Sequence, residues 1–127
     1  MNVKRGSQMS LIQKWNQLWD KYMKNTAEIV DETEFIEDEL RRYVIVFSGL
    51  VQGVGFRYEV YQLAQKLGLT GFVKNMPDET VYAEIEGPKN KILFLIEQMK
   101  SIPRIHISNV CIDEMPMLND TVFEIAN

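Results

Sequence analysis

Apolar residues in the first forty positions recur at steps of three and four, the spacing that places side chains on one face of a helix. Within residues 9–25 this stripe consists of Leu11, Ile12, Trp15, Leu18, Trp19, Tyr22 and Met23. A second, shorter stripe follows Asp31 and Glu34, which have the spacing of a helix-capping box, and it consists of Phe35, Ile36 and Leu40. The pattern therefore predicts two helices in this part of the chain.

From residue 41 the pattern changes to alternating strand and helix signals. β-branched and aromatic runs, or strict alternation with polar residues, predict strands at 43–47, 70–75, 81–86, 105–112 and 121–126. Helical spacing predicts one helix between Phe56 and Gly68 and a second that starts at Pro88. The inward-facing positions of the fourth strand change parity near Ser108 and Asn109, which predicts a β-bulge there.

The predicted order β-α-β-β-α-β-β is that of a ferredoxin-like split βαβ sandwich with one added strand. This α/β (α+β) fold has a mostly antiparallel sheet with both helices on one face. We therefore expect an N-terminal helical extension over residues 1–40 and a ferredoxin-like domain over residues 41–127. Because one sheet face lacks helices, we expect the helix with Trp15 and Trp19 to pack there, or to join two chains through residues 9–25.

Composition narrows the classes of partner. The chain has 127 residues, of which 46% are hydrophobic and 25% charged, as is typical of a soluble globular protein. Its net charge of −4 argues against nucleic acid as a partner. No stretch approaches the roughly 18 consecutive apolar residues of a transmembrane helix, so we expect no membrane association. Cys111 is the only cysteine, which excludes an internal disulfide and fits a cytoplasmic location.

A glycine-rich segment, GLVQGVGFR at residues 49–57, joins the first strand of the domain to its first helix. In one interpretation, Gly49, Gly53 and Gly55 adopt positive φ and let the backbone approach a bound group closely. Backbone N–H groups and the positive end of the helix dipole would then hold a phosphate, with Arg57 binding two of its oxygens. In the other interpretation, the glycines only shape a turn and Arg57 is a solvated charge. Spacing alone leaves both open, since glycine-rich patterns are common.

The same nine residues resemble the acylphosphatase signature G-x-V-Q-G-V-x-F-R and match it at every fixed position. A second segment, GFVKN at residues 71–75, resembles that family's G-[WF]-V-[KR]-N segment. The resemblance extends over about residues 41–126. It implies a ferredoxin-like fold and an enzyme that hydrolyses the carboxyl-phosphate bond of small acyl phosphates, releasing inorganic phosphate.

The resemblance also implies roles for individual residues. Arg57 is expected to bind the phosphate, and Asn75 is expected to orient the attacking water. The implied phosphate-binding loop consists of Gln52, Gly53, Val54, Gly55, Phe56 and Arg57. Neither motif contains an Asp or Glu that could act as general base, so the substrate's own phosphate is expected to take the proton, as is proposed for the family. This scheme requires no metal and no cofactor.

One position departs from the family pattern, and other functions remain open. Family members commonly have N-x-x-D-G-[ST]-V where this chain reads NMPDETV, so Glu79 replaces a glycine. If this residue adopts positive φ, the cost is on the order of 1 kcal/mol.

The alternative function is a non-catalytic anion- or partner-binding regulatory module assembled through its N-terminal helices. The family also occurs within larger carbamoyl-phosphate-using maturation proteins, but the absence of zinc-finger cysteines argues against that role here. Intact Arg57 and Asn75 favour the enzyme.

Overall fold

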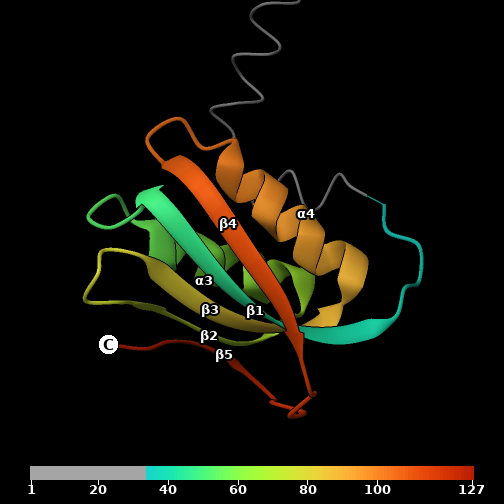
Figure 1. Ribbon diagram of the computed structural model, residues 1–127. Helices are drawn as coiled ribbons and strands as arrows, with labels where there is room; N and C mark the ends of the chain where they lie inside the picture. The colour runs from blue at the N-terminus through green and yellow to red at the C-terminus, as the bar shows by residue number, and fades with distance from the viewer. Residues whose placement is uncertain (1–33) are drawn as a thin grey trace, which may run out of the picture.

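The structure, a computed structural model, describes residues 34–127 as one five-stranded sheet with two helices packed against it (Figure 1). Its elements in chain order are β1 (Leu40–Leu50), α3 (Phe56–Leu67), β2 (Thr70–Asn75), β3 (Val81–Pro88), α4 (Lys89–Lys100), β4 (His106–Met115) and β5 (Phe123–Ile125). Every strand and helix predicted within residues 43–126 is present. Helix α4 begins one residue later than predicted, because Pro88 still pairs with Leu40 in the sheet.

The strands lie in the order β4-β1-β3-β2-β5, and all neighbours are antiparallel except β2 and β5, which are parallel. Both helices cover the same face of the sheet (Figure 1). This arrangement confirms the predicted ferredoxin-like sandwich. The added strand β5 is shorter than predicted and lies at the edge of the sheet, where the Ala126 N–H donates to the Val73 carbonyl oxygen at 2.9 Å.

The core lies between the helices and one face of the sheet, to which the inner strand β1 contributes. Tyr43, Ile45 and Phe47 alternate along β1, as expected of a strand with one face against a core, and all three are buried. Helix α3 contributes five buried side chains at helical spacing, namely Phe56, Val60, Leu63, Ala64 and Leu67. Burying one large apolar side chain stabilises the fold by about 1.5–3 kcal/mol. The packing of these α3 side chains against β1 therefore fixes the end of β1 relative to the start of α3.

The β-bulge predicted near Ser108 is confirmed. Ser48 pairs with Asn109, and the register then shifts so that Ser108 is the extra residue on β4. Gly49 lies opposite this bulge with a φ of 124°, and a Cβ on it would lie 2.1 Å from the carbonyl oxygen of His106. The positive φ predicted for Gly49 is therefore present, and it allows two backbones to pack closely; Gly49 does not line the pocket described below.

The segment before β1 corrects one prediction. Residues 34–39 have no regular secondary structure and Leu40 begins β1, so the second predicted N-terminal helix is wrong over these residues. The segment instead contacts the start of α4, where the Asp38 carboxylate accepts from the Asn90 N–H at 3.0 Å. The Asn90 side chain in turn donates to the Ile36 carbonyl oxygen at 2.9 Å. Asp38 thus caps a helix that follows Pro88, a contact that local spacing cannot reveal.

The first predicted helix, and with it the proposed contact region 9–25, lies outside the described residues. Within residues 34–127, no helix is long and apolar enough to cross a membrane.

A buried arginine occupies the sheet face opposite to the helices. Arg42 is 1% exposed and donates hydrogen bonds to the carboxylates of Glu84 at 2.9 Å, Asp120 at 2.9 Å and Glu86 at 3.2 Å. Burial lowers the pKa of Arg42, but these three hydrogen bonds outweigh the burial and raise it. Glu86 also accepts from the Leu118 N–H at 2.8 Å, so the Arg42 network ties the segment after β4 to the sheet.

Candidate active site

The loop of residues 51–55 connects β1 to α3 and is fixed in the core at both ends. Val51 is fully buried, and Phe56, the first residue of α3, is 2% exposed. The ring of Phe56 packs edge-on against Phe47 of β1, with ring centroids 4.8 Å apart. Between these two anchors, Gly53 and Gly55 are exposed. The loop is therefore held firmly while its backbone faces outward.

The loop presents backbone donors at the N-terminus of α3. Gly55 is the N-cap residue in a left-handed conformation, with a φ of 77°, and it gives the first turn no side-chain hydrogen bond. Gly53 also has a positive φ, of 75°. Among the described residues, the backbone N–H groups of residues 52–57 donate no hydrogen bond. Donors without a protein acceptor at the positive end of a helix dipole are suited to binding an anion.

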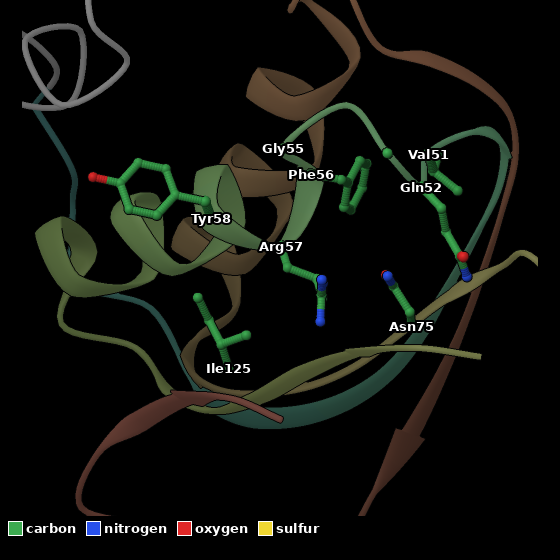
Figure 2. A pocket seen from close by; sticks show the side chains of 9 residues that line it. Val51, Gln52, Gly55, Phe56, Arg57, Tyr58, Asn75 and Ile125 are labelled. Carbon is green, nitrogen blue, oxygen red and sulfur yellow. The ribbon is translucent and has the colours of Figure 1, made fainter. Parts of the chain in front are cut away.

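Arg57 extends from the first turn of α3 into the space beside the loop (Figure 2). Its Nη1 atom donates to the carbonyl oxygen of Asn127 at 2.7 Å and to the Oδ1 atom of the same residue at 3.2 Å. In the part of the chain that the structure describes, its guanidinium pairs with no carboxylate and makes no other hydrogen bond. Within residues 34–127, the Nε and Nη2 donors of Arg57 therefore have no acceptor and remain available to a bound anion.

Asn75 ends β2, and its side chain points toward the same space as Arg57 (Figure 2). The Oδ1 atom of Asn75 is buried and has no hydrogen-bond partner among the described residues. A buried acceptor without a partner is costly, and such an atom is usually explained by a ligand or a water molecule. Asn75 therefore contributes a carboxamide with an unsatisfied oxygen to the wall of the pocket that the loop and Arg57 also line.

Asn127 connects the Arg57 side chain to the Asn75 backbone. Its Oδ1 atom accepts from both Arg57 and the Asn75 N–H, the latter at 3.3 Å. Its Nδ2 atom donates to the Asn75 carbonyl oxygen at 2.8 Å. Asn127 thereby fixes the spacing between α3 and the end of β2. Sequence reasoning missed this residue, because a single Asn beyond the last strand carries no motif.

Gln52 links the loop to the hairpin that follows Asn75. Its Nε2 atom donates to the carbonyl oxygens of Met76 and Thr80, both at 2.9 Å. Asn75 keeps its place opposite Val81 in the β2–β3 ladder. The Gln52 side chain therefore ties the loop and the end of β2 to one another, in addition to the backbone role that the motif implies.

The hairpin between β2 and β3 forms with Glu79 in the place of the glycine that is common in the family. Glu79 has a φ of 71°, the left-handed conformation that favours glycine, so the strain considered for this position is present. Asp78 compensates in part, since its Oδ1 atom accepts from the Thr80 hydroxyl at 2.6 Å and from the Thr80 N–H at 3.1 Å. These hydrogen bonds, the side-chain one first, lower the pKa of Asp78.

The loop, Arg57 and Asn75 line one pocket of about 230 Å³ (Figure 2). Five of the six predicted loop residues line it, whereas Val54 does not. The lining residues are Val51, Gln52, Gly53, Gly55, Phe56, Arg57, Tyr58, Asn75 and Ile125. The volume suits a small molecule. The two interpretations of residues 49–57 are therefore compatible, because the glycines shape the turn and the turn also faces this pocket.

A second residue that sequence reasoning missed contacts the loop from the other side. The Nε atom of Arg104 donates to the Val54 carbonyl oxygen at 2.8 Å, and its guanidinium also pairs with Glu59 of α3. Nothing in the sequence signals this contact, because Arg104 lies some fifty residues away from the loop and in no recognised motif. Within residues 34–127, no group of three or more His, Cys, Asp or Glu side chains is placed to hold a metal ion.

The chain is similar in sequence and in structure to proteins of one family. The family model described as Acylphosphatase matches residues 43–125. An acylphosphatase of Bifidobacterium longum (strain NCC 2705) is 39% identical over 83 residues, which is 65% of this chain and 84% of that protein. One of Acaryochloris marina (strain MBIC 11017) is 44% identical over 81 residues, or 63% of this chain and 87% of that protein. The crystal structure of acylphosphatase from Bacillus subtilis has a TM-score of 0.65 and 35% identity, and the match covers 70% of this chain and all of that one.

Proposed function

The chain belongs to the acylphosphatase family and hydrolyses acyl phosphates, and we propose that residues 52–57 and Asn75 form its active site. One observation carries this proposal. Within residues 34–127, backbone donors without an acceptor, an arginine without an Asp or Glu partner and the side chain of Asn75, whose buried Oδ1 atom has no donor, all belong to residues that line the same pocket. The backbone donors and the arginine are complementary to a phosphoryl group, and the carboxamide oxygen is complementary to a water molecule.

The loop and Arg57 bind the phosphoryl group. Backbone N–H groups of residues 52–57 donate to its non-bridging oxygens, and the guanidinium of Arg57 adds donors and a full positive charge. Negative charge on these oxygens is stabilised where the loop already holds its donors in place, so little reorganisation is needed during the reaction. Phe56 and Val51, both buried, keep the donors in position.

Asn75 orients the attacking water. Its Oδ1 atom accepts a hydrogen bond from the water, which places the water oxygen in line with the phosphorus atom. The new bond forms between the water oxygen and phosphorus, and the bond between phosphorus and the carboxyl oxygen breaks. The electron pair of that bond leaves with the carboxylate, and a phosphate oxygen takes the proton from water. A carboxamide is suited to this positioning because it hydrogen bonds to water without acting as a strong base.

Two further proposals concern the whole chain. Self-association through residues 9–25 is supported by their apolar stripe, and deletion of residues 1–33 would test it. The full chain is expected to have the mass of two or more chains in solution and the shortened chain that of one, whereas the same number of chains per particle in both would reject self-association. A cytoplasmic location is supported by Cys111, whose exposed thiol has no disulfide partner in the chain. Cell fractionation would test it, and recovery with exported proteins would contradict it.

Hydrolysis of a synthetic acyl phosphate by the wild type and by Arg57→Gln tests the proposed site. Wild type is expected to hydrolyse acetyl phosphate. The variant is expected to lose at least about a thousandfold in kcat/KM, because it lacks the charged donors that stabilise the transferring phosphoryl group. Retention of most activity by Arg57→Gln would remove this arginine from the site. An inactive wild type would instead favour the alternative of a non-catalytic anion- or partner-binding module.

A further inference from the structure

We propose that Arg104 is a positioning residue, which holds the Val54–Gly55 peptide so that the Gly55 N–H points toward the bound phosphoryl group. This inference rests on the proposed function of the loop. It concerns a residue outside both sequence motifs, in the turn between α4 and β4.

Arg104 is anchored well enough to act on the loop. Ile102 and Ile105, on either side of it, are 7% and 4% exposed, so the turn that carries Arg104 is fixed to the core. From there its Nε atom reaches the Val54 carbonyl oxygen at 2.8 Å. The other end of its guanidinium pairs with Glu59, in the first turn of α3. Arg104 therefore joins the turn, the loop and the helix that carries Arg57.

Peptide geometry converts this contact into an orientation of the loop. The carbonyl of Val54 and the N–H of Gly55 belong to one planar trans peptide, so they point in opposite directions. Gly55 lines the pocket and Val54 does not. A guanidinium that holds the Val54 oxygen on the outer side consequently directs the Gly55 N–H toward the pocket.

The two glycines make such a restraint necessary. Gly53 and Gly55 both have positive φ and lack the Cβ that limits backbone rotation. If the peptide between Val54 and Gly55 rotated, it would present a carbonyl oxygen to the anion in place of a donor. Arg104 packs directly on this peptide, since a Cβ on Gly55 would lie 3.5 Å from its Nη2 atom. The contact therefore favours the orientation that binds an anion.

Charge alone does not account for the expected role of Arg104. Its guanidinium is paired with the Glu59 carboxylate and its side chain is 52% exposed, so its long-range attraction for an anion is offset and screened. Lys100 provides a matched control, because it is also a half-exposed cation paired with a glutamate, Glu97, but it does not contact the loop. Arg104→Gln and Lys100→Gln remove the same charge from neighbouring parts of the chain.

The test compares the full-length wild type with Arg104→Gln, Arg104→Lys and Lys100→Gln. Inorganic phosphate is titrated into each protein by calorimetry, and the Gly55 amide resonance is followed by NMR during the same titration. Hydrolysis of acetyl phosphate is measured in parallel. Arg104→Gln is expected to bind phosphate about tenfold more weakly, because one hydrogen bond to a charged group is misdirected. Its KM rises with its phosphate dissociation constant, and the phosphate-induced shift of the Gly55 amide is reduced.

Arg104→Lys keeps a donor for the Val54 oxygen and is expected to restore phosphate affinity to within about threefold of wild type. Lys100→Gln is expected to match wild type. Equal phosphate affinity and an equal Gly55 shift in Arg104→Gln and Lys100→Gln would overturn the positioning role, while an active wild type would leave the proposed function intact. A wild type that neither binds phosphate nor hydrolyses acetyl phosphate would instead contradict the proposed function itself.

Discussion

Two arginines of the domain, Arg42 on β1 and Arg57 at the start of α3, differ in how fully their charges are satisfied. Arg42 is buried and donates hydrogen bonds to the three carboxylates of Glu84, Glu86 and Asp120. Arg57 lines a pocket, and among the described residues it donates hydrogen bonds only to the backbone and side-chain oxygens of Asn127. One guanidinium has its partners within the protein, whereas the other has donors available for a ligand.

The difference shows how the same side chain serves stability in one region and binding in another. A buried charge is tolerated only when it is paired, so the Arg42 network contributes to holding the sheet and the segment that contains Asp120. A charge that faces a pocket without a carboxylate partner adds little to folding but attracts an anion. The comparison predicts that removing Arg42 affects mainly stability and that removing Arg57 affects mainly activity.

Replacing Arg42 should have the largest effect on stability. Arg42→Met removes the cation that pairs with the carboxylates of Glu84, Glu86 and Asp120, and breaking a buried ion pair in this way typically costs about 3–5 kcal/mol in the free energy of unfolding. Urea denaturation would measure this loss. Arg57→Gln should lower the free energy of unfolding by less than about 1 kcal/mol, because its contacts are partly exposed.

Arg41→Met is the matched control for that experiment. Arg41 is adjacent in sequence and pairs with Glu39 and Glu114, but these carboxylates are 66% and 56% exposed. Exposed pairs of this kind contribute about 0–1 kcal/mol. Equal destabilisation by Arg41→Met and Arg42→Met would contradict the structural role assigned to the Arg42 network.

Asn75→Ala should give the next largest effect, and on the reaction barrier instead of on folding. Losing one preorganised polar group raises the barrier by roughly 2–4 kcal/mol. The loss should appear in kcat more than in the phosphate inhibition constant, since Asn75 is proposed to contact water and not the phosphoryl group. Steady-state kinetics with acetyl phosphate would measure both, and an unchanged kcat would end this assignment.

Glu79→Gly should stabilise the domain. The substitution relieves a left-handed conformation but increases the freedom of the unfolded chain, so a net gain of about 0.5–1 kcal/mol in the free energy of unfolding is expected. Thermal denaturation would detect the gain. A loss of stability would mean that the Glu79 side chain contributes more than its backbone strain costs.

The smallest expected effect concerns Asp78 and pH. The hydrogen bonds from Thr80 lower the folded-state pKa of Asp78, so they favour its charged form. The associated stability is present above the unfolded pKa near about 4, and it is lost as the pH falls through the folded pKa. Asp78→Asn should therefore be slightly less stable than wild type at neutral pH, and the difference should shrink in acid. A difference that is independent of pH would contradict the charged hydrogen bond.

Local pattern predicted most of the fold for a physical reason. Strands such as β1 and helices such as α3 bury one face against the core, and burial imposes a period of two or of 3.6 on the sequence. The bulge at Ser108 could be predicted because it shifts that period by one residue. The segment 34–39 could not, since its conformation depends on contacts of Asp38 and Ile36 with the distant Asn90.

The candidate site shows the same division. Arg57 and Asn75 were found because each lies in a motif that a family resemblance identifies, and the structure brings both to one pocket. The contacts made by Arg104 and Asn127 connect segments that are far apart in the chain, so no local pattern reports them. The Arg42 network was missed for a related reason: its partners Glu84 and Glu86 are set by the register between β1 and β3.

The most direct test of the central claim is an NMR titration of the full chain with inorganic phosphate. The claim is that main-chain N–H groups of residues 52–57, together with Arg57, hold the phosphoryl group. The account predicts that the largest amide shifts occur in residues 53–57 and that the Arg57 Nε–H resonance moves with them, while Arg42 is unaffected. Saturable shifts confined to another part of the domain, with the loop amides unchanged, would contradict it.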